Sequence, residues 1–183
     1  MPTVISHSVV GLAAASVFPA EGHLLRFWLL SAICPVIPDL DSIAFKLGIP
    51  YSHFFGHRGF FHSLLFALIV GIFVTTVFFR DKPPFTKDWV LLCGYFSLIT
   101  ATHGILDALT SGGLGIALLS PFDNTRYFFP WSPIKVSPID VRSFFSAWGM
   151  RVILNELIWI WIPSAVIFIV GRILFHGKAL LHR

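Results

Sequence analysis

Apolar residues along the chain are gathered into five segments that are separated by short polar connections. Two early segments, 8–18 and 24–38, are short, and Pro35 and Pro38 are expected to end the second. Pro163 predicts a kink in the last segment, which neighbouring helices in a bilayer can accommodate. Three segments reach the length of about 20 apolar residues that a bilayer requires, namely 60–79, 89–109 and 152–175. The pattern predicts an all-α integral membrane helical bundle of four or five membrane segments.

The composition agrees with a place in the membrane and excludes several classes of protein. Hydrophobic residues make up 56% and charged residues 12% of the 183 residues, whereas soluble domains carry about 25% charged residues. So few charges cannot cover a soluble globule, and the length suits a single membrane-embedded domain over 1–183. The net charge of +4 is not gathered into one basic run, so we expect no nucleic-acid partner.

Basic residues predict the orientation of the bundle. The short loop 80–88 joins two long segments and carries Arg80, Lys82 and Lys87. Because short loops rich in Lys and Arg stay in the cytoplasm, we expect the opposite end at the periplasmic face of a bacterial inner membrane. The turn expected at 19–23 makes the first two segments an antiparallel hairpin with its tip on the same side as loop 80–88.

Residues with metal-binding side chains stand at the segment ends that this threading brings to one face. HRGFFHS opens the segment 60–79 and HGILD closes the segment 89–109, so both motifs lie away from loop 80–88. The acidic pair of PDLD follows the second segment, and a histidine precedes the first. Seven groups are therefore expected to converge: His7, Asp39, Asp41, His57, His62, His103 and Asp107.

The spacings within these motifs suit shared metal ligands. His103 and Asp107 are four residues apart and project from one face of a helix. His57 and His62 can share an ion only if His57 is in a loop and the backbone turns at Gly59. The aspartates after Pro38 are expected to alternate in an extended segment, one binding metal and the other binding a second ion or orienting a histidine.

Histidine and aspartate ligands without cysteine favour zinc in a catalytic site, with manganese or iron as alternatives, and seven groups allow one or two ions. Three further residues are candidates for catalytic roles. Arg126 and Arg58 can hold a substrate phosphate. Glu156 lies one turn inside the last segment and is a candidate ligand, general base or proton shuttle, or alternatively a partner of Arg151 or Arg58.

The long segment 110–150 is rich in proline, glycine and aromatic residues, among them Tyr127, Phe128, Phe129 and Trp131. Such residues suit the membrane interface. We interpret the segment as an interfacial cap over the site, with an aromatic belt loop of no catalytic role as the alternative.

Taken together, SH, PDLD, HRGFFHS, HGILD and PFDNTRYFFPWSPI resemble the YdjM-like, LexA-regulated family of membrane-bound metal-dependent hydrolases over about residues 1–165. The resemblance implies a bacterial inner-membrane protein with hydrolytic activity, and it names no substrate. A looser similarity joins the HxxxD motif to the zinc-dependent phospholipase C and P1-type nuclease group. That group has a second helix motif with His and Glu, which this chain lacks unless Glu156 stands in alone.

We therefore expect a hydrolase in which a metal-activated water cleaves a phosphoester or ester of a lipid-like substrate, in the manner of a phospholipase C. Membrane lipids are the expected partners, and the oligomeric state is open. Two non-enzymatic alternatives remain: a protein for ion or metal transport, and a stress-response protein whose metal only staples helices. Transport requires polar groups strung along the membrane normal, so their clustering at one end favours the enzyme.

Overall fold

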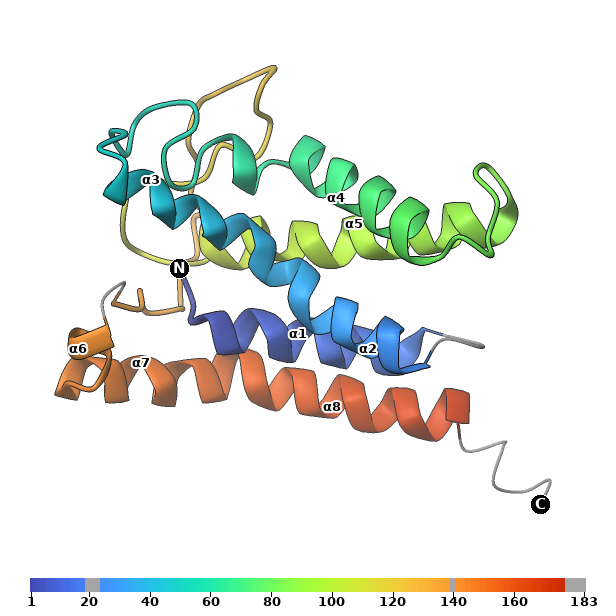
Figure 1. Cartoon of the computed structure of the whole chain (residues 1–183). Helices are drawn as coiled ribbons and strands as arrows, with labels where there is room; N and C mark the ends of the chain where they lie inside the picture. Colours follow the sequence, from blue (N-terminus) through green and yellow to red (C-terminus); the bar gives the residue numbers. More distant parts are fainter. Residues whose placement is uncertain (19–23, 139–140, 177–183) are drawn as a thin grey trace.

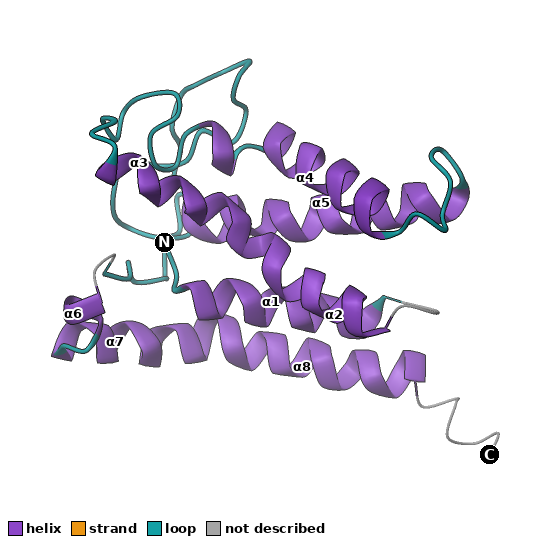
Figure 2. Ribbon diagram, viewed as in Figure 1, coloured by secondary structure: helices purple, strands orange, loops and turns teal. Residues whose placement is uncertain are grey.

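The structure of the protein is a computed structural model that describes residues 1–18, 24–138 and 141–176 (Figure 1). Within these ranges the chain forms helices, loops and two isolated β-bridges, and no strand (Figure 2). The predicted all-α fold class is thus confirmed. The turn expected at 19–23 lies outside the described residues.

The first half of the bundle begins with α1 (Val4–Val17) and α2 (Leu24–Ile33). From α2 the chain continues as a 3₁₀ helix, η1 (Cys34–Ser42), and then as the short α3 (Ile43–Lys46). The predicted end of this segment at its two prolines is therefore wrong. Pro35 occupies the first turn of η1, where a missing N–H is tolerated, and Pro38 lies inside it. The acidic pair that follows Pro38 is accordingly helical and not extended.

A helical hairpin forms the second layer. After the short η2 (Phe60–His62), Ser63 accepts a hydrogen bond from the Phe66 amide and so begins α4 (Leu64–Phe78) four residues later than predicted. Thr86 caps α5 (Lys87–Ala108) in the same way. The two helices touch closely at Gly71, where an added Cβ would lie 2.1 Å from Ser97 Oγ.

The C-terminal helical run lies against α1 on the side away from α4 and α5 (Figure 1). It comprises α6 (Val141–Phe144), α7 (Ala147–Glu156), the π-helical η3 (Leu157–Trp161), α8 (Ile162–Gly171) and the π-helical η4 (Arg172–His176). The π-helical turn ends shortly before Pro163. Such local π turns let backbone carbonyls that lose the proline N–H find another donor.

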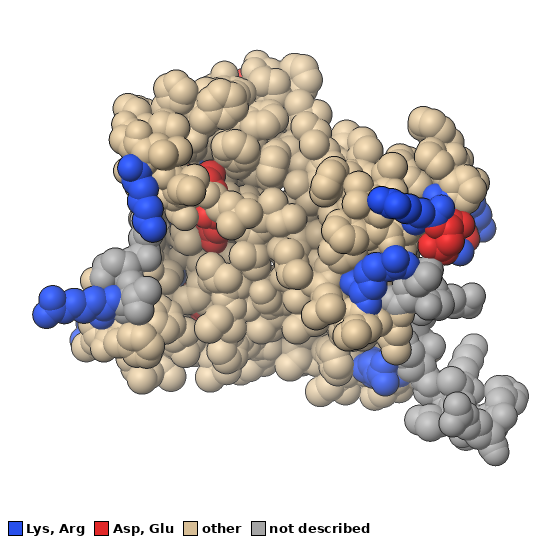
Figure 3. Space-filling view, in the orientation of Figure 1, with Lys and Arg blue, Asp and Glu red and all other residues tan. Residues whose placement is uncertain are grey.

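Three helical runs have the length and hydropathy of membrane spans, namely Leu24–Lys46, Lys87–Ala108 and Ala147–Leu174, and α1 and α4 are shorter apolar helices. The middle of the visible face carries hardly any basic side chains, which gather at its two ends (Figure 3). Loop 80–88 stands at one of these ends (Figure 1). The structure thus presents an apolar belt to the membrane and places the helix ends with the predicted ligands opposite that loop.

Candidate metal centre

All seven predicted ligands meet in one buried cluster at the end of the bundle, and none is more than 6% exposed. His7 comes from the first turns of α1, the two aspartates of PDLD from η1, and His62 from the end of η2. His103 and Asp107 occupy the last two turns of α5. His57 lies in the turns before η2. Four separate pieces of chain thus supply one centre.

Sharp local turns bring the two histidines of HRGFFHS to the same centre. Arg58 has a φ of 65°, in the left-handed region that side chains rarely adopt. At Gly59 an added Cβ would lie 2.2 Å from the Phe54 carbonyl oxygen, so only glycine fits there. The predicted requirement for His57 in a loop and a backbone turn at Gly59 is confirmed.

The imidazoles of His62 and His103 face each other, with 3.0 Å between their Nε2 atoms. The Nδ1 atom of His103 lies 2.7 Å from the Pro35 carbonyl oxygen, and a carbonyl can only accept. Nδ1 must therefore carry the hydrogen, so Nε2 of a neutral His103 presents a lone pair to His62. If His62 carries its hydrogen at Nε2, it donates to this lone pair. If the hydrogen is at Nδ1, on the side of Asp41, two lone pairs face each other, and a cation between the rings would hold them together.

The sequence makes the Pro35 carbonyl available for this contact. In a 3₁₀ helix the carbonyl of residue i accepts from the N–H of residue i+3. The residue three after Pro35 is Pro38, which has no N–H. His103 therefore meets a carbonyl oxygen without its helical partner, and this contact fixes the orientation of the ring.

Asp41 lies beside the Nδ1 atoms of two histidines and orients their rings. Its Oδ1 atom lies 2.6 Å from His57 Nδ1, and its Oδ2 atom lies 3.1 Å from His62 Nδ1. A carboxylate at Nδ1 favours the tautomer whose Nε2 is free to bind a metal. Asp41 also accepts the Arg58 backbone N–H at 3.2 Å, which anchors the turn to η1. Of the roles predicted for the acidic pair, orientation of a histidine suits Asp41.

Asp39 and Asp107 point their carboxylates toward the facing imidazoles. Asp39 Oδ1 lies 3.4 Å from His103 Nε2 and 3.8 Å from His62 Nε2. Asp107 Oδ2 lies 3.7 Å from His62 Nε2. All four oxygens of these carboxylates are buried without a hydrogen bond among the described residues. Buried carboxylate oxygens of this kind are costly unless a cation neutralises them, and Arg58 supplies one positive charge beside Asp107 Oδ2.

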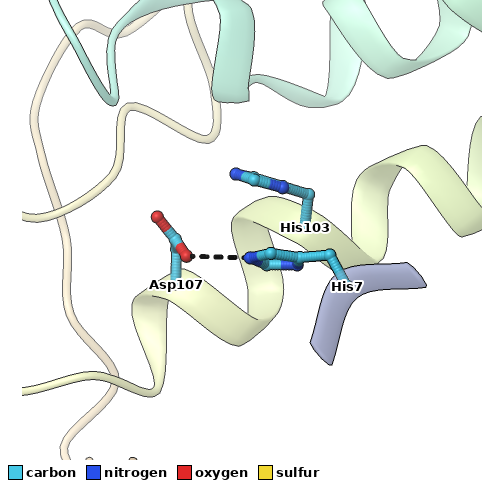
Figure 4. Close-up of side chains that lie close together, drawn as sticks. All are labelled: His7, His103 and Asp107. Atoms are coloured by element: carbon cyan, nitrogen blue, oxygen red, sulfur yellow. Dashed lines mark ion pairs between the residues drawn. The ribbon is translucent and has the colours of Figure 1, made fainter. Parts of the chain in front are cut away.

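His7 completes the cluster from α1. Its ring stacks on that of His103 with 3.9 Å between the centroids, and its Nε2 atom lies 3.6 Å from Asp107 Oδ1 (Figure 4). Both ring nitrogens of His7 lack a hydrogen bond among the described residues. Ligand atoms of His7, His103 and Asp107 lie within 4.8 Å of one another, as do those of Asp39, His57 and His62. The donor atoms present fit one divalent ion or two neighbouring ions of the zinc type.

The charge of the cluster also acts on its histidines. Burial alone would lower the pKa of His62, but the contacts with Asp39 and Asp41 and the charge of Asp107 raise it to about 9. Without a metal, His62 therefore takes up a proton, which places a positive charge beside His103.

Arg58 and Arg126 connect the centre to the cap. Arg58 is 1% exposed, and its Nε atom lies 3.1 Å from Asp107 Oδ2 while its Nη1 atom donates to the Gly112 carbonyl. Arg126 donates to the carbonyl oxygens of His57, at 2.8 Å, and Tyr51, at 2.9 Å. In these contacts the guanidinium groups of Arg58 and Arg126 bind groups of the protein itself. Arg126 ties the cap to the turn that carries His57.

Segment 110–138 packs over this end of the bundle through backbone hydrogen bonds. The Ala117 amide donates to the Arg58 carbonyl at 3.2 Å, and the Leu64 amide donates to the Leu118 carbonyl at 3.0 Å. The Phe129 amide donates to the carbonyl at the end of α5. Residues 110–138 thus lie over the site as predicted. The prediction of an irregular segment as far as residue 150 is wrong, because 141–150 contain α6 and the start of α7.

Glu156 is fully buried beside the start of α1 and not among the seven groups. Its Oε1 atom accepts the Thr3 amide at 2.6 Å, and its Oε2 atom accepts the hydroxyls of Thr3 at 2.6 Å and Ser6 at 2.5 Å. Trp161 Nε1 donates to the Ser6 hydroxyl at 2.7 Å. The alternative of a pair with Arg151 or Arg58 has no counterpart among the described contacts.

Sequence reasoning missed two supports of the centre. The first is the Pro35 carbonyl, which the P-x-x-P spacing of PVIP could have revealed. The second is the binding of Glu156 to Thr3 and Ser6, for which the only local signal is that Thr3 is a suitable cap for the first apolar segment. The pairing across 153 residues leaves no trace in a single sequence.

Comparison with known proteins identifies a matching family and two relatives that are similar to this chain. A model of the family described as "YdjM inner membrane protein" matches residues 1–179. The "Inner membrane protein YbcI" of Escherichia coli (strain K12) is 35% identical over 170 residues, which cover 91% of this chain and 95% of that protein. The "Uncharacterized protein YvsG" of Bacillus subtilis (strain 168) is 38% identical over 97 residues, 49% of this chain and 54% of that protein. No solved structure matches.

Proposed function

The chain belongs to the YdjM family of inner membrane proteins, and from this premise and its buried centre we propose that it is a membrane-bound metal-dependent hydrolase. The proposed substrate is a lipid-like phosphoester or ester. The proposed cofactor is a divalent metal, zinc first, with manganese or iron as alternatives.

One observation carries the proposal: the Nε2 atoms of His62 and His103 lie 3.0 Å apart and face two carboxylates without hydrogen bonds. Two nitrogens bound to one zinc ion at about 2.0–2.1 Å are separated by roughly 3–3.4 Å at bond angles between a right angle and the tetrahedral one. The side chains therefore stand close to the separation that one shared ion requires. His62, His103, Asp39 and Asp107 would hold it, with His7 as a further ligand or as a ligand of a second ion.

An ion in such a site lowers the pKa of bound water toward about 7 and polarises a phosphoryl or carbonyl oxygen. The residues of the chain provide the surroundings for that chemistry. Asp41 orients His57 and His62, the Pro35 carbonyl orients His103, and Arg58 sets a positive charge beside Asp107. Segment 110–138 is hydrogen-bonded to the turn and helix ends that carry the centre, and the seven clustered side chains are buried.

The site is proposed to lie at the periplasmic face of the inner membrane. The support is the basic loop 80–88 at the opposite end of the bundle, because short loops rich in Lys and Arg favour the cytoplasm. Lipid head groups are concentrated at this depth, which favours a lipid-like substrate.

A metal that only staples helices is the second candidate function. The observation that favours it is that the centre joins residues of α1, η1, η2 and α5 in one buried cluster. A closed coordination sphere with no open position would distinguish this role from catalysis.

Metal analysis of purified protein tests the proposal. The wild type is expected to carry stoichiometric metal, and His103→Ala and Asp107→Ala are expected to lose it. His53→Ala and Asp88→Ala are matched controls, because both residues are exposed and outside the centre. Metal content unchanged in both site variants would refute the hydrolase hypothesis. Metal-dependent turnover in a screen of phospholipids and lipid phosphates then separates the enzyme from the staple.

A further inference from the structure

An apolar pocket of about 400 Å³ opens directly beside the centre. It lies between η1 and α3 on one side and η2 and the first turn of α4 on the other. Its walls include Leu40, Ala44, Leu47 and Phe61, and the single ionisable residue that lines it is Asp41. A pocket of this size and polarity suits the hydrocarbon part of a ligand.

Asp41 forms the boundary between this pocket and the centre. The carboxylate that lines the pocket is the one that contacts His57 Nδ1 at 2.6 Å and His62 Nδ1 at 3.1 Å. The other nitrogen of His62 faces His103. A ligand in the pocket therefore ends one side chain away from the proposed metal ligands.

The mouth of the pocket lies among exposed apolar side chains of a candidate membrane span. Leu40 and Leu47 are each 68% exposed at its edge, and Leu40 belongs to the candidate span Leu24–Lys46. Acidic atoms are visible in a hollow of the otherwise uncharged surface over η1 (Figure 3). In a bilayer, the molecules that meet such an apolar opening are lipids, because the surrounding solvent is hydrocarbon.

We infer that this pocket holds one acyl chain of a membrane phospholipid that reaches it sideways from the bilayer, with its polar end toward Asp41 and the centre. The assignment of the ligand as substrate rests on the proposed function. It narrows the substrate class to lipids with a chain that fills the pocket between η1 and η2.

The protein has a second apolar pocket, so an apolar lining alone does not single out the pocket beside Asp41 as the lipid site. The second pocket has about 480 Å³ and lies between α1 and the run from η3 to α8, lined by Leu12, Trp161, Ala165 and other residues. No ionisable residue lines it, and none of the seven ligands belongs to it. A lipid there would have no polar group of the centre within reach, so this pocket serves as the control.

Photo-crosslinking of the full chain in lipid nanodiscs tests the inference. The discs contain phosphatidylethanolamine and phosphatidylglycerol, with a small share of phosphatidylethanolamine that carries a diazirine in the middle of one acyl chain. Peptides from 37–66 are expected to take up about tenfold more label than peptides from the lipid-facing turns 68–73 of α4, as for a site that holds its chain about 1.4 kcal/mol more favourably than free bilayer. Equal labelling of the two regions would overturn the inference.

Matched variants separate the two apolar pockets. Ala44→Trp fills the pocket beside Asp41 and is expected to reduce its labelling to that of α4, whereas Ala165→Trp fills the other pocket and is expected to change nothing there. Leu47→Trp narrows the mouth from an exposed position and serves if Ala44→Trp does not fold. Undiminished labelling of 37–66 in a folded pocket variant would also overturn the inference.

The experiment keeps this inference apart from the proposed function. Metal content is measured without any lipid, and crosslinking is measured without any turnover. Preferential labelling in a protein that binds no metal supports the pocket and removes the hydrolase. Metal binding and turnover with uniform labelling supports the hydrolase and removes the pocket.

Discussion

Replacement of Glu156 by glutamine tests whether the centre depends on the anchoring of α1. The carboxylate accepts three hydrogen bonds of 2.5–2.6 Å from Thr3 and Ser6, and all the groups are buried. His7 follows Ser6 directly, so the same contacts set the position of its ring against His103. We predict that Glu156→Gln lowers both the stability of the protein and its affinity for metal, although Glu156 is not among the clustered ligands.

The magnitude follows from the number of donors. A glutamine side chain has one acceptor oxygen in place of two, and its NH₂ group faces donors that already point toward it. Hydrogen bonds to a charged group contribute about 1.5–3 kcal/mol each. Loss of one or two of the three lowers the free energy of unfolding by about 2–4 kcal/mol, or roughly 4–16 °C in melting temperature for a chain of this size. Metal affinity is expected to fall about 10–100-fold, as for other residues that position a ligand.

The assay is metal titration of the purified protein together with thermal unfolding. Ser6→Ala removes one donor and leaves Glu156 in place, and it is expected to lower metal affinity in the same direction. Asn155→Ala is the matched control, because the neighbouring Asn155 side chain contacts Pro133 and Lys135 and not α1. The control is expected to keep wild-type metal affinity.

Two results would refute this reasoning. Wild-type metal affinity and stability in Glu156→Gln, with turnover abolished, would assign Glu156 to proton transfer, one of the roles predicted from sequence. A loss of affinity in Glu156→Gln without any loss in Ser6→Ala would show that the contact with α1 is not what the centre requires.

Three further predictions concern orientation, protonation and packing. Asp41→Asn is expected to reduce metal affinity about 10–100-fold, because the amide can no longer accept from both histidine Nδ1 atoms. The ligands that face the shared ion stay in place. Isothermal titration measures the metal affinity, and an unchanged value would contradict the orienting role of Asp41. In metal-free protein the pKa of His62 is raised from 6.5 to about 9, so its contribution to stability is complete below pH 6.5 and is lost as the pH rises through 9. Because metal displaces this proton, apparent metal affinity should increase with pH across the same range, and a flat profile in buffered titrations would count against it. Gly71→Ala is expected to destabilise the α4–α5 hairpin by about 1–3 kcal/mol, because its Cβ would lie 2.1 Å from Ser97 Oγ. Gly94→Ala is the control, because the space around Gly94 is open. Equal melting temperatures of the two variants would contradict the close contact of α4 and α5 at Gly71.

The meeting of the ligands was predictable because it depends on topology and not on detail. Two apolar segments joined by the short loop 80–88 must run antiparallel, so the histidines that open one and close the other share an end. The same reasoning placed His7 and PDLD there. It required only segment lengths and turn positions, which hydropathy gives reliably for membrane helices.

The path of the chain through PVIPDLD could not be predicted from the prolines. Proline ends an α-helix, but in the first turn of a 3₁₀ helix its missing N–H has no consequence, so α2 continues into η1 and α3. The sequence also could not assign separate roles to Asp39 and Asp41. Their roles follow from which side of the helix faces His57 and which faces His103, and that depends on the 3₁₀ winding.

The two prolines connect the membrane span to the chemistry of the centre. Pro38 removes the N–H that the Pro35 carbonyl would otherwise accept, and the carbonyl turns to His103 at 2.7 Å. The resulting 3₁₀ winding carries Asp39 to the inner side and Asp41 to the wall that it shares with the apolar pocket. A regular α-helix in this span would satisfy the Pro35 carbonyl within the backbone and leave the His103 ring without its acceptor. The interruption of the helix is therefore what allows a span that faces lipid to orient a histidine in a buried polar centre.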